Sequence, residues 1–186
     1  YGLFRYDGYE VRTYKSNLYT PGLLVNNNVL CVEEDYSHRL WIGTHEGLCM
    51  LDKRTGKMKK LQLDGVSKQR LNEIHVTKEN RVYLGYIRGM AYYDEMQDTL
   101  ALMTRKNCRG DVPESVNIQT LFEDVNGDLL IGTWKDGLYR YCIKENTFLH
   151  YPPLDEENSV LALFQDSRGV MWIGTSGSGL YKAPFS

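Results

Sequence analysis

The stretch at residues 124–141 reads DVNGDLLIGTWKDGLYRY, and three other segments of the chain repeat its pattern. Close copies occupy residues 35–51 (DYSHRLWIGTHEGLCML) and 166–182 (DSRGVMWIGTSGSGLYK), and a weaker copy occupies residues 77–93 (TKENRVYLGYIRGMAYY). Each copy has a polar turn, an apolar run that ends in Gly-Thr (Gly-Tyr in the weaker copy), a short loop and a second glycine that opens another run. The rest of the chain consists of the segments that separate these copies.

The spacing of the glycines is nearly regular. Those inside the apolar run lie 42, 47 and 42 residues apart, at Gly43, Gly85, Gly132 and Gly174. Those that open the next run are separated by 45, 42, 48 and 42 residues, at Gly2, Gly47, Gly89, Gly137 and Gly179. A period in this range is typical of repeat architectures in which each repeat is one supersecondary unit.

Each unit reads as four short strands, and the two inner ones are apolar on both faces. The strands of a sheet with one solvent-exposed face alternate apolar and polar residues. The two inner strands do not alternate, so both of their faces must be covered. Sheets stacked radially around an axis meet that requirement, and we therefore predict an all-β fold, a β-propeller of four-stranded antiparallel blades. The repeated glycine marks a close backbone approach, and Trp41 and Trp172, two residues earlier, are expected to fill the wedge between blades.

We predict one propeller region, residues 1–186, with about four repeats. It divides into strands C and D of an incomplete blade, a blade, a degenerate blade, a second full blade and an incomplete blade, at residues 1–15, 28–64, 71–104, 116–152 and 159–186. The chain starts at Tyr1, so we expect it to be a piece of a longer protein. The blades form either an arc of a larger ring or a closed four-bladed ring. An arc would leave an apolar blade face at each end, which favours self-association or neighbouring blades as partners.

Composition excludes several classes of function. The net charge is −2 and the pI about 6.1, which gives no electrostatic footprint for nucleic acid. No apolar run approaches the roughly 18 residues of a membrane helix, so we expect no membrane contact. The cysteines form no CxxC pair and are interpreted as free thiols, with a disulfide as the alternative in an oxidising compartment: Cys31, Cys49, Cys108 and Cys142.

No catalytic or metal-binding constellation stands out, and we predict no cofactor. The histidines lie in different units without metal-ligand spacing: His38, His45, His75 and His150. The remaining function is ligand binding. We assign it to the loops between the second and third strands of each blade, because loops on a rigid scaffold commonly carry function. The candidate ligand-binding residues are Trp134, Lys135, Asp136, His45, Glu46, Arg88 and Tyr86.

Trp134 is the sharpest of these candidates, since His45 and Ser176 hold the same slot in other copies and the fold does not require an indole there. An exposed indole can stack on a sugar ring while the neighbouring charges bind hydroxyls or a carboxylate. The alternative is that Trp134 packs against the next blade or a neighbouring domain.

The segments LWIGTHEGL, LIGTWKDGLYRY and MWIGTSGSGLYK resemble the two-component regulator propeller repeat, and the opening GLFRYDGYEVRTY resembles the first blade remnant of such receptors. The weaker copy at residues 77–93 departs from the pattern, with Tyr86 in place of Thr and Met90 in place of Leu. The resemblance implies a periplasmic sensor domain of a hybrid two-component histidine kinase of Bacteroidetes, anchored in the inner membrane. In this family two seven-bladed propellers and an immunoglobulin-like domain precede the membrane helix, kinase, receiver and DNA-binding domain.

The resemblance also implies a function, because the family senses breakdown products of complex glycans. We therefore expect a non-enzymatic sensor fragment that binds an oligosaccharide and signals through dimer packing. The alternatives are a propeller enzyme, a lyase or glycosidase, which needs a paired acid and base, and a pure protein-interaction scaffold.

Overall fold

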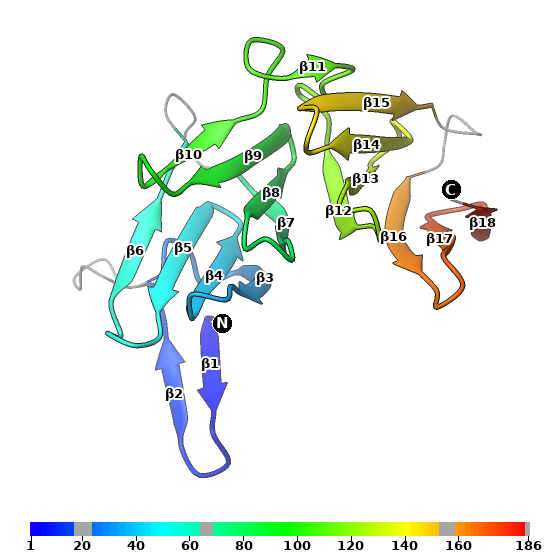
Figure 1. Ribbon diagram of the computed structural model, residues 1–186. Helices are drawn as coiled ribbons and strands as arrows, with labels where there is room; N and C mark the ends of the chain where they lie inside the picture. Colours follow the sequence, from blue (N-terminus) through cyan, green and yellow to red (C-terminus); the bar gives the residue numbers. More distant parts are fainter. Residues whose placement is uncertain (17–23, 64–68, 153–158, 185–186) are drawn as a thin grey trace.

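The computed structural model describes residues 1–16, 24–63, 69–152 and 159–184, and within them the chain is built from strands and turns without a helix. The strands form five separate sheets that follow one another along an open arc (Figure 1). The predicted β-propeller of antiparallel blades is therefore confirmed. In the described residues, no helix is of the length and apolarity that a membrane crossing requires.

Three sheets are complete blades with antiparallel neighbours in chain order. Blade 1 contains β3 (Val29–Glu34), β4 (Arg39–Thr44), β5 (Gly47–Asp52) and β6 (Met58–Leu61). Blade 2 contains β7 (Leu71–Val76), β8 (Val82–Tyr86), β9 (Gly89–Asp94) and β10 (Thr99–Leu102). Blade 3 contains β12 (Ile118–Glu123), β13 (Leu129–Thr133), β14 (Leu138–Cys142) and β15 (Thr147–Tyr151).

Two smaller sheets stand at the ends of the arc. The N-terminal hairpin pairs β1 (Leu3–Tyr6) with β2 (Val11–Tyr14). The last blade contains β16 (Val160–Gln165), β17 (Val170–Thr175) and β18 (Leu180–Pro184). These sheets do not join into one, so the described chain is an arc and not a closed four-bladed ring (Figure 1).

Blade 3 also has a fifth strand that the repeat did not predict. The two-residue strand β11 (Arg109–Gly110) pairs in parallel with the outer strand β15, beside Thr147 and Phe148. The long connection between blades 2 and 3 thus runs along the outer edge of blade 3 before it enters β12.

The innermost strands hold the arc together. Strands β3 and β7, β7 and β12, and β12 and β16 lie in contact across successive blade boundaries. In each blade the pairing of the first two strands shifts register after the first residue, as between Val29 and Cys31 of β3. This irregularity turns the first residue of each innermost strand away from its own blade and toward the preceding one.

The repeated glycine receives that first residue. A Cβ added at Gly43 would lie 2.4 Å from Cys31 Sγ of the same blade and 2.8 Å from Leu71 Cδ2 of the next. One added at Gly132 would lie 2.6 Å from Thr120 Cγ2 of the same blade and 2.7 Å from Val160 Cγ1 of the next. Gly85 faces Ile118 in the same way, at 2.6 Å from Cγ2. The glycine is therefore a socket for an apolar side chain of the next blade, which explains why a larger residue does not occur at this point of the repeat.

Gly174 in the last blade has no following blade against it. The nearest atom to an added Cβ there is the Cβ of Ala162 in the same blade, at 3.4 Å. The exposed apolar residues Leu161, Phe164 and Leu180 lie in this blade as well. Gly132 and Gly174 thus share a sequence context and differ in what packs on them.

We predict that Gly132→Ala lowers the free energy of unfolding by about 1–3 kcal/mol, the usual cost of overpacking a close contact. Gly174→Ala should change it by less than about 0.5 kcal/mol, since the added methyl reaches only ordinary contact distance. Urea denaturation of both variants measures the difference, and equal destabilisation would contradict the socket interpretation.

Candidate functional site

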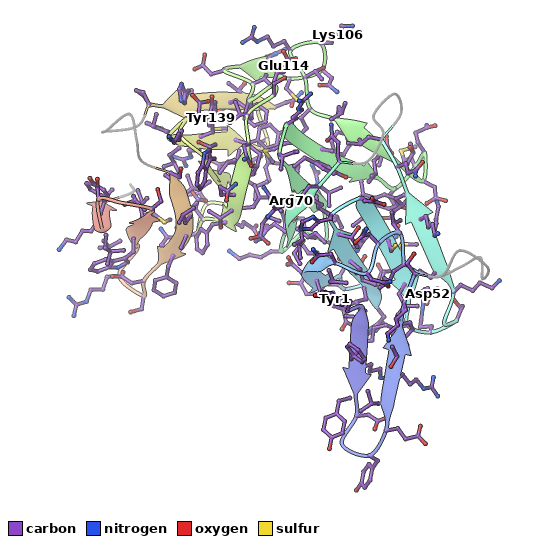
Figure 2. The ribbon with its side chains drawn as sticks, turned by 180° about the vertical axis from the view of Figure 1, so that it is seen from behind. Tyr1, Asp52, Arg70, Lys106, Glu114 and Tyr139 are labelled. Carbon is purple, nitrogen blue, oxygen red and sulfur yellow. The ribbon has the colours of Figure 1, made fainter. Side chains whose placement is uncertain are left out.

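The loops between the second and third strands lie at the same end of every blade. In each blade, the first loop residue donates its backbone N–H to a carbonyl in the segment that leads into the same blade. These bonds join His45 to Asn28, Ile87 to Arg70, Trp134 to Asn117 and Ser176 to Ser159, at 2.8–3.3 Å. We call the end formed by these loops and entry segments the loop face, and Figure 2 shows Arg70 near the middle of the arc.

A threonine closes three of these loops. The hydroxyl of Thr133 donates to the carbonyl of Gly137 at 2.7 Å, and Thr44 and Thr175 make the same bond to Gly47 and Gly179. The glycines have positive φ, between 73° and 136°, which L-residues rarely adopt. The Gly-Thr pair of the repeat therefore fixes the loop geometry from which the candidate side chains project.

Trp134 projects from a loop that is bonded to two blades. Its indole is 47% exposed, while its backbone N–H bonds to Asn117 and the N–H of Lys135 bonds to the Ser159 hydroxyl of the next blade at 3.1 Å. Lys135 is exposed and has a φ of 64°. The loop is thus pinned to two blades, and its two longest side chains face outward.

Asp136 serves the scaffold around this loop. Its carboxylate accepts the Tyr139 hydroxyl at 2.5 Å, and its carbonyl accepts Nε2–H of His150 at 2.8 Å. The Tyr139 and His150 rings stack with centroids 4.3 Å apart. Burial, and after it the bond to Asp136, raises the pKa of Tyr139, which Figure 2 labels in blade 3. Asp136 therefore positions the loop, and its carboxylate and carbonyl oxygens are less available to a ligand.

The other predicted residues are distributed over blades 1 and 2. His45 and Glu46 are half-buried in the blade 1 loop, and Arg88 is exposed in the blade 2 loop. Tyr86 is only 2% exposed and packs in the core with Leu71 and Leu84. Tyr86 occupies the slot of the loop-closing threonine, and its ring presents almost no surface to a ligand.

The opposite end of each blade is capped by the first residue of the turn between the first two strands. Asp35 accepts the amides of Ser37 and Arg39, and its second oxygen accepts Nε1–H of Trp41 at 2.9 Å. Asp166 repeats this arrangement with Trp172 at 3.0 Å. Burial would raise the pKa of Asp35, but these donors and the Arg39 guanidinium hold it below its usual value. The Asp-x5-Trp spacing in two repeats is therefore a hydrogen-bonded pair.

A charged clamp that the sequence analysis missed joins blades 1 and 2 at this end. The Arg39 side chain is 11% exposed and donates to Asp35 at 2.6 Å and to both carboxylate oxygens of Glu95 at 2.7 and 2.9 Å. Its guanidinium lies 5.4 Å from the Trp41 ring and 5.3 Å from the Tyr93 ring. A cation bound by two carboxylates and two aromatic faces fills this boundary.

Two carboxyl groups on neighbouring innermost strands were also missed. Burial first, and then the charge of Glu33, raise the pKa of Glu73 to about 7, although the Ile74 amide bonded to Glu73 opposes the shift. Burial also raises the pKa of Glu33, which accepts the Val76 amide across the blade boundary at 3.0 Å. The sequence signal for Glu73 is an acidic residue between the apolar residues Leu71 and Ile74 of the innermost strand LNEIHV.

A raised carboxyl pKa favours folding while the group is protonated. With an unfolded value near 4.3, the contribution of Glu73 is fully present below about pH 4.3 and is lost as the pH rises through the folded value of about 7. We predict that Glu73→Gln flattens the fall in Tm between about pH 4 and 7 and raises Tm at the upper end of this range. The exposed Glu145→Gln is the control, and thermal melts across this pH range would refute the assignment if both variants behaved alike.

The described residues contain no group of three His, Cys, Asp or Glu side chains placed to hold a metal ion. All four cysteines are free thiols. Burial raises the pKa of Cys31 to about 12, and the Cys49 sulfur accepts the Val25 amide at 3.1 Å. These two thiols pack as small apolar residues with one hydrogen-bonding atom.

A family model described as "two component regulator propeller" matches residues 23–46 and 155–177. The resemblance drawn from the repeat is thereby confirmed for these two segments. No curated protein matches the chain.

Solved structures with the same fold include two extracellular domains from B. thetaiotaomicron. The domain assigned to the hybrid two component system BT3049 is 19% identical, with a TM-score of 0.73, and the match covers 94% of this chain and 23% of that one. The domain assigned to the hybrid two component system BT4673 is 20% identical, with a TM-score of 0.78, and the match covers 100% and 25%. This chain therefore spans about a quarter of the length of each.

An enzyme shares the fold as well. Virginiamycin B lyase from Staphylococcus aureus is 10% identical, with a TM-score of 0.67, and the match covers 95% of this chain and 60% of the lyase. At these identities the similarity shows the fold alone.

Proposed function

We propose that this chain is part of the periplasmic ligand-sensing region of a hybrid two-component sensor histidine kinase whose parent protein is anchored in the inner membrane. The match to regulator propeller repeats and the fold shared with extracellular domains of such systems support this assignment. The fragment itself has no catalytic role in this proposal. It contributes rigid blades that hold recognition loops.

The ligand in this proposal is a glycan-derived oligosaccharide bound on the loop face. The observation that carries it is the exposed Trp134 indole on a loop that Asn117 and Ser159 fix from both sides. A preorganised aromatic surface loses little conformational entropy when a sugar ring stacks on it. The exposed ammonium of Lys135 and the exposed guanidinium of Arg88 are the charges available for hydroxyl or carboxylate groups at this end.

Signal transmission in this proposal uses the packing of subunits or of neighbouring blades. The last blade supports this mode of signalling. No side chain of a following blade packs on Gly174, and Phe164 and Leu180 are exposed in the same blade. A further blade of a seven-bladed ring would cover this face. A ligand that favours one subunit arrangement over another would then shift the receptor between signalling states.

A propeller enzyme is the second candidate, because the lyase shares the fold and Glu33 and Glu73 form a carboxyl pair with raised pKa values. Both groups accept backbone amides, at 3.0 Å for Glu33 and 3.1 Å for Glu73, which supports a structural use of the pair. Turnover of a bound sugar would favour the enzyme. A protein partner without any sugar binding would favour a scaffold.

We predict that Trp134→Ala weakens oligosaccharide binding by about 1–3 kcal/mol, the usual contribution of a stacked aromatic ring, without lowering Tm. The matched control is Tyr36→Ala, which removes an exposed aromatic ring from a turn at the opposite end. Calorimetric titration with a panel of oligosaccharides measures both. Equal affinities of the two variants would remove Trp134 from the site.

A further inference from the structure

The inner edge of the boundary between blades 2 and 3 carries a cluster of side-chain amides. Asn72 lies on β7, Gln119 lies on β12, and Asn117 comes directly before β12. These two innermost strands contact each other on the inner side of the arc (Figure 1). The backbone carbonyl of Asn117 accepts the N–H of Trp134 at 2.8 Å. The cluster therefore lies on the loop face, at the base of the loop that carries the exposed indole.

Two of these amides fix the orientation of the third. Asn72 Nδ2 donates to Asn117 Oδ1 at 3.0 Å, and Gln119 Nε2 donates to the same oxygen at 2.8 Å. Because two donors converge on this atom, it is the carbonyl oxygen of the amide, and the other branch of the Asn117 side chain is the NH2 group.

The two groups that remain are a donor and an acceptor. Among the described residues, nothing accepts either N–H of Asn117 Nδ2, and nothing donates to Gln119 Oε1. Both residues are half-buried, but neither of these atoms is enclosed by the protein. The cluster thus presents an NH2 group and a carbonyl oxygen to the solvent from side chains that are held in place.

Asn72 gains no such freedom from the arrangement. Its second N–H donates to the backbone carbonyl of Ile118 at 2.7 Å, so both of its donors are used across the blade boundary. Its own oxygen is buried and accepts no hydrogen bond from the described part of the chain. A buried acceptor without a donor destabilises a fold and calls for an explanation. The orientation of the Asn117 amide supplies one that stability does not.

The fold does not require amides at these positions. In the register of the sheets, Ser159 and Leu161 of the last blade stand where Asn117 and Gln119 stand in blade 3. The last blade packs on blade 3 without them. The amide pair is therefore a feature of the same blade as the exposed Trp134 and not of the repeat.

We infer that Asn117 and Gln119 bind two adjacent hydroxyl groups of a neutral sugar ring that stacks on Trp134. The Asn117 NH2 group donates to one hydroxyl oxygen, and Gln119 Oε1 accepts the O–H of the neighbouring hydroxyl. A vicinal diol fits this pair because each hydroxyl can donate and accept. Asn72 is a positioning residue that keeps the Asn117 amide oriented before the sugar arrives, which lowers the cost of binding. The inference rests on the proposed function and names the part of the ligand that the site recognises.

The first test removes the donors and retains the scaffold. Asn117→Asp keeps an oxygen that accepts from Asn72 and Gln119, but it replaces the NH2 group with a second oxygen. In calorimetric titrations with maltotriose, cellotriose and xylotriose, the whole chain should bind at least one trisaccharide. Asn117→Asp should weaken that binding about tenfold, the loss expected for two hydrogen bonds.

The matched control is Asn126→Asp, which makes the same change of charge in an exposed turn at the opposite end of blade 3. It should leave the affinity unchanged. Thermal melts of both variants show that each is folded, so a loss of binding that is confined to Asn117→Asp supports the amide as part of the site.

The second test observes the amide directly by nuclear magnetic resonance of the isotope-labelled chain. The side-chain NH2 signal that disappears in Asn117→Asp identifies Asn117. That signal should shift as the trisaccharide is added, whereas the NH2 signal of Asn126 should not. An amide that only joins the two blades would not respond to the sugar.

Two outcomes would overturn the inference: an unchanged affinity in Asn117→Asp, or an Asn117 signal that stays constant while the sugar binds. If Trp134→Ala lost binding in either case, the proposed function would stand without the amide pair. If the parent chain bound none of these trisaccharides and no other oligosaccharide of the panel, both the amide pair and the glycan ligand would be refuted.

Discussion

The close approach of one blade's innermost strand to the backbone of the preceding blade is the constraint on which the rest of the structure depends. It requires a residue without a side chain at one point of the second strand and an apolar side chain at the first position of the next blade, as Gly85 and Ile118 show. The blades can then stack with both apolar faces covered. The contact recurs at each of the three boundaries from blade 1 to the last blade, at Gly43, Gly85 and Gly132, so the glycine recurs in the second strand of each of these blades.

This constraint explains which parts of the fold could be predicted from the sequence. The glycine period located the inner strands and the loops between them, since a socket and a loop-closing Thr–Gly pair each demand particular residues. The outer edge was less predictable because no such demand acts there. Strand β11 forms where Gly110, with a φ of 74°, passes against the Phe148 backbone, and one glycine outside the period carries no signal of a parallel pairing.

The candidate site shows the same division. The sequence placed Trp134 in a loop slot, and the structure exposes its ring there. It also placed Tyr86 in the loop group, but a tyrosine in the threonine slot cannot make the compact hydroxyl bond that closes the loop, and its ring turns into the apolar core. The Arg39 clamp was beyond prediction for another reason: Glu95 is 56 residues away, and their pairing depends on how two blades meet.

The repeat therefore separates two tasks within each boundary. On the inner half, the glycine and the apolar residue that packs on it must satisfy the same packing at every blade, so these two positions vary little. The outer half is less constrained: Arg39 bridges Asp35 and Glu95 between blades 1 and 2, whereas Thr77 and Ile143 stand at the positions of these carboxylates one boundary further along. A propeller built on this plan can therefore change the residues at one outer boundary while the inner contacts continue to hold the fold.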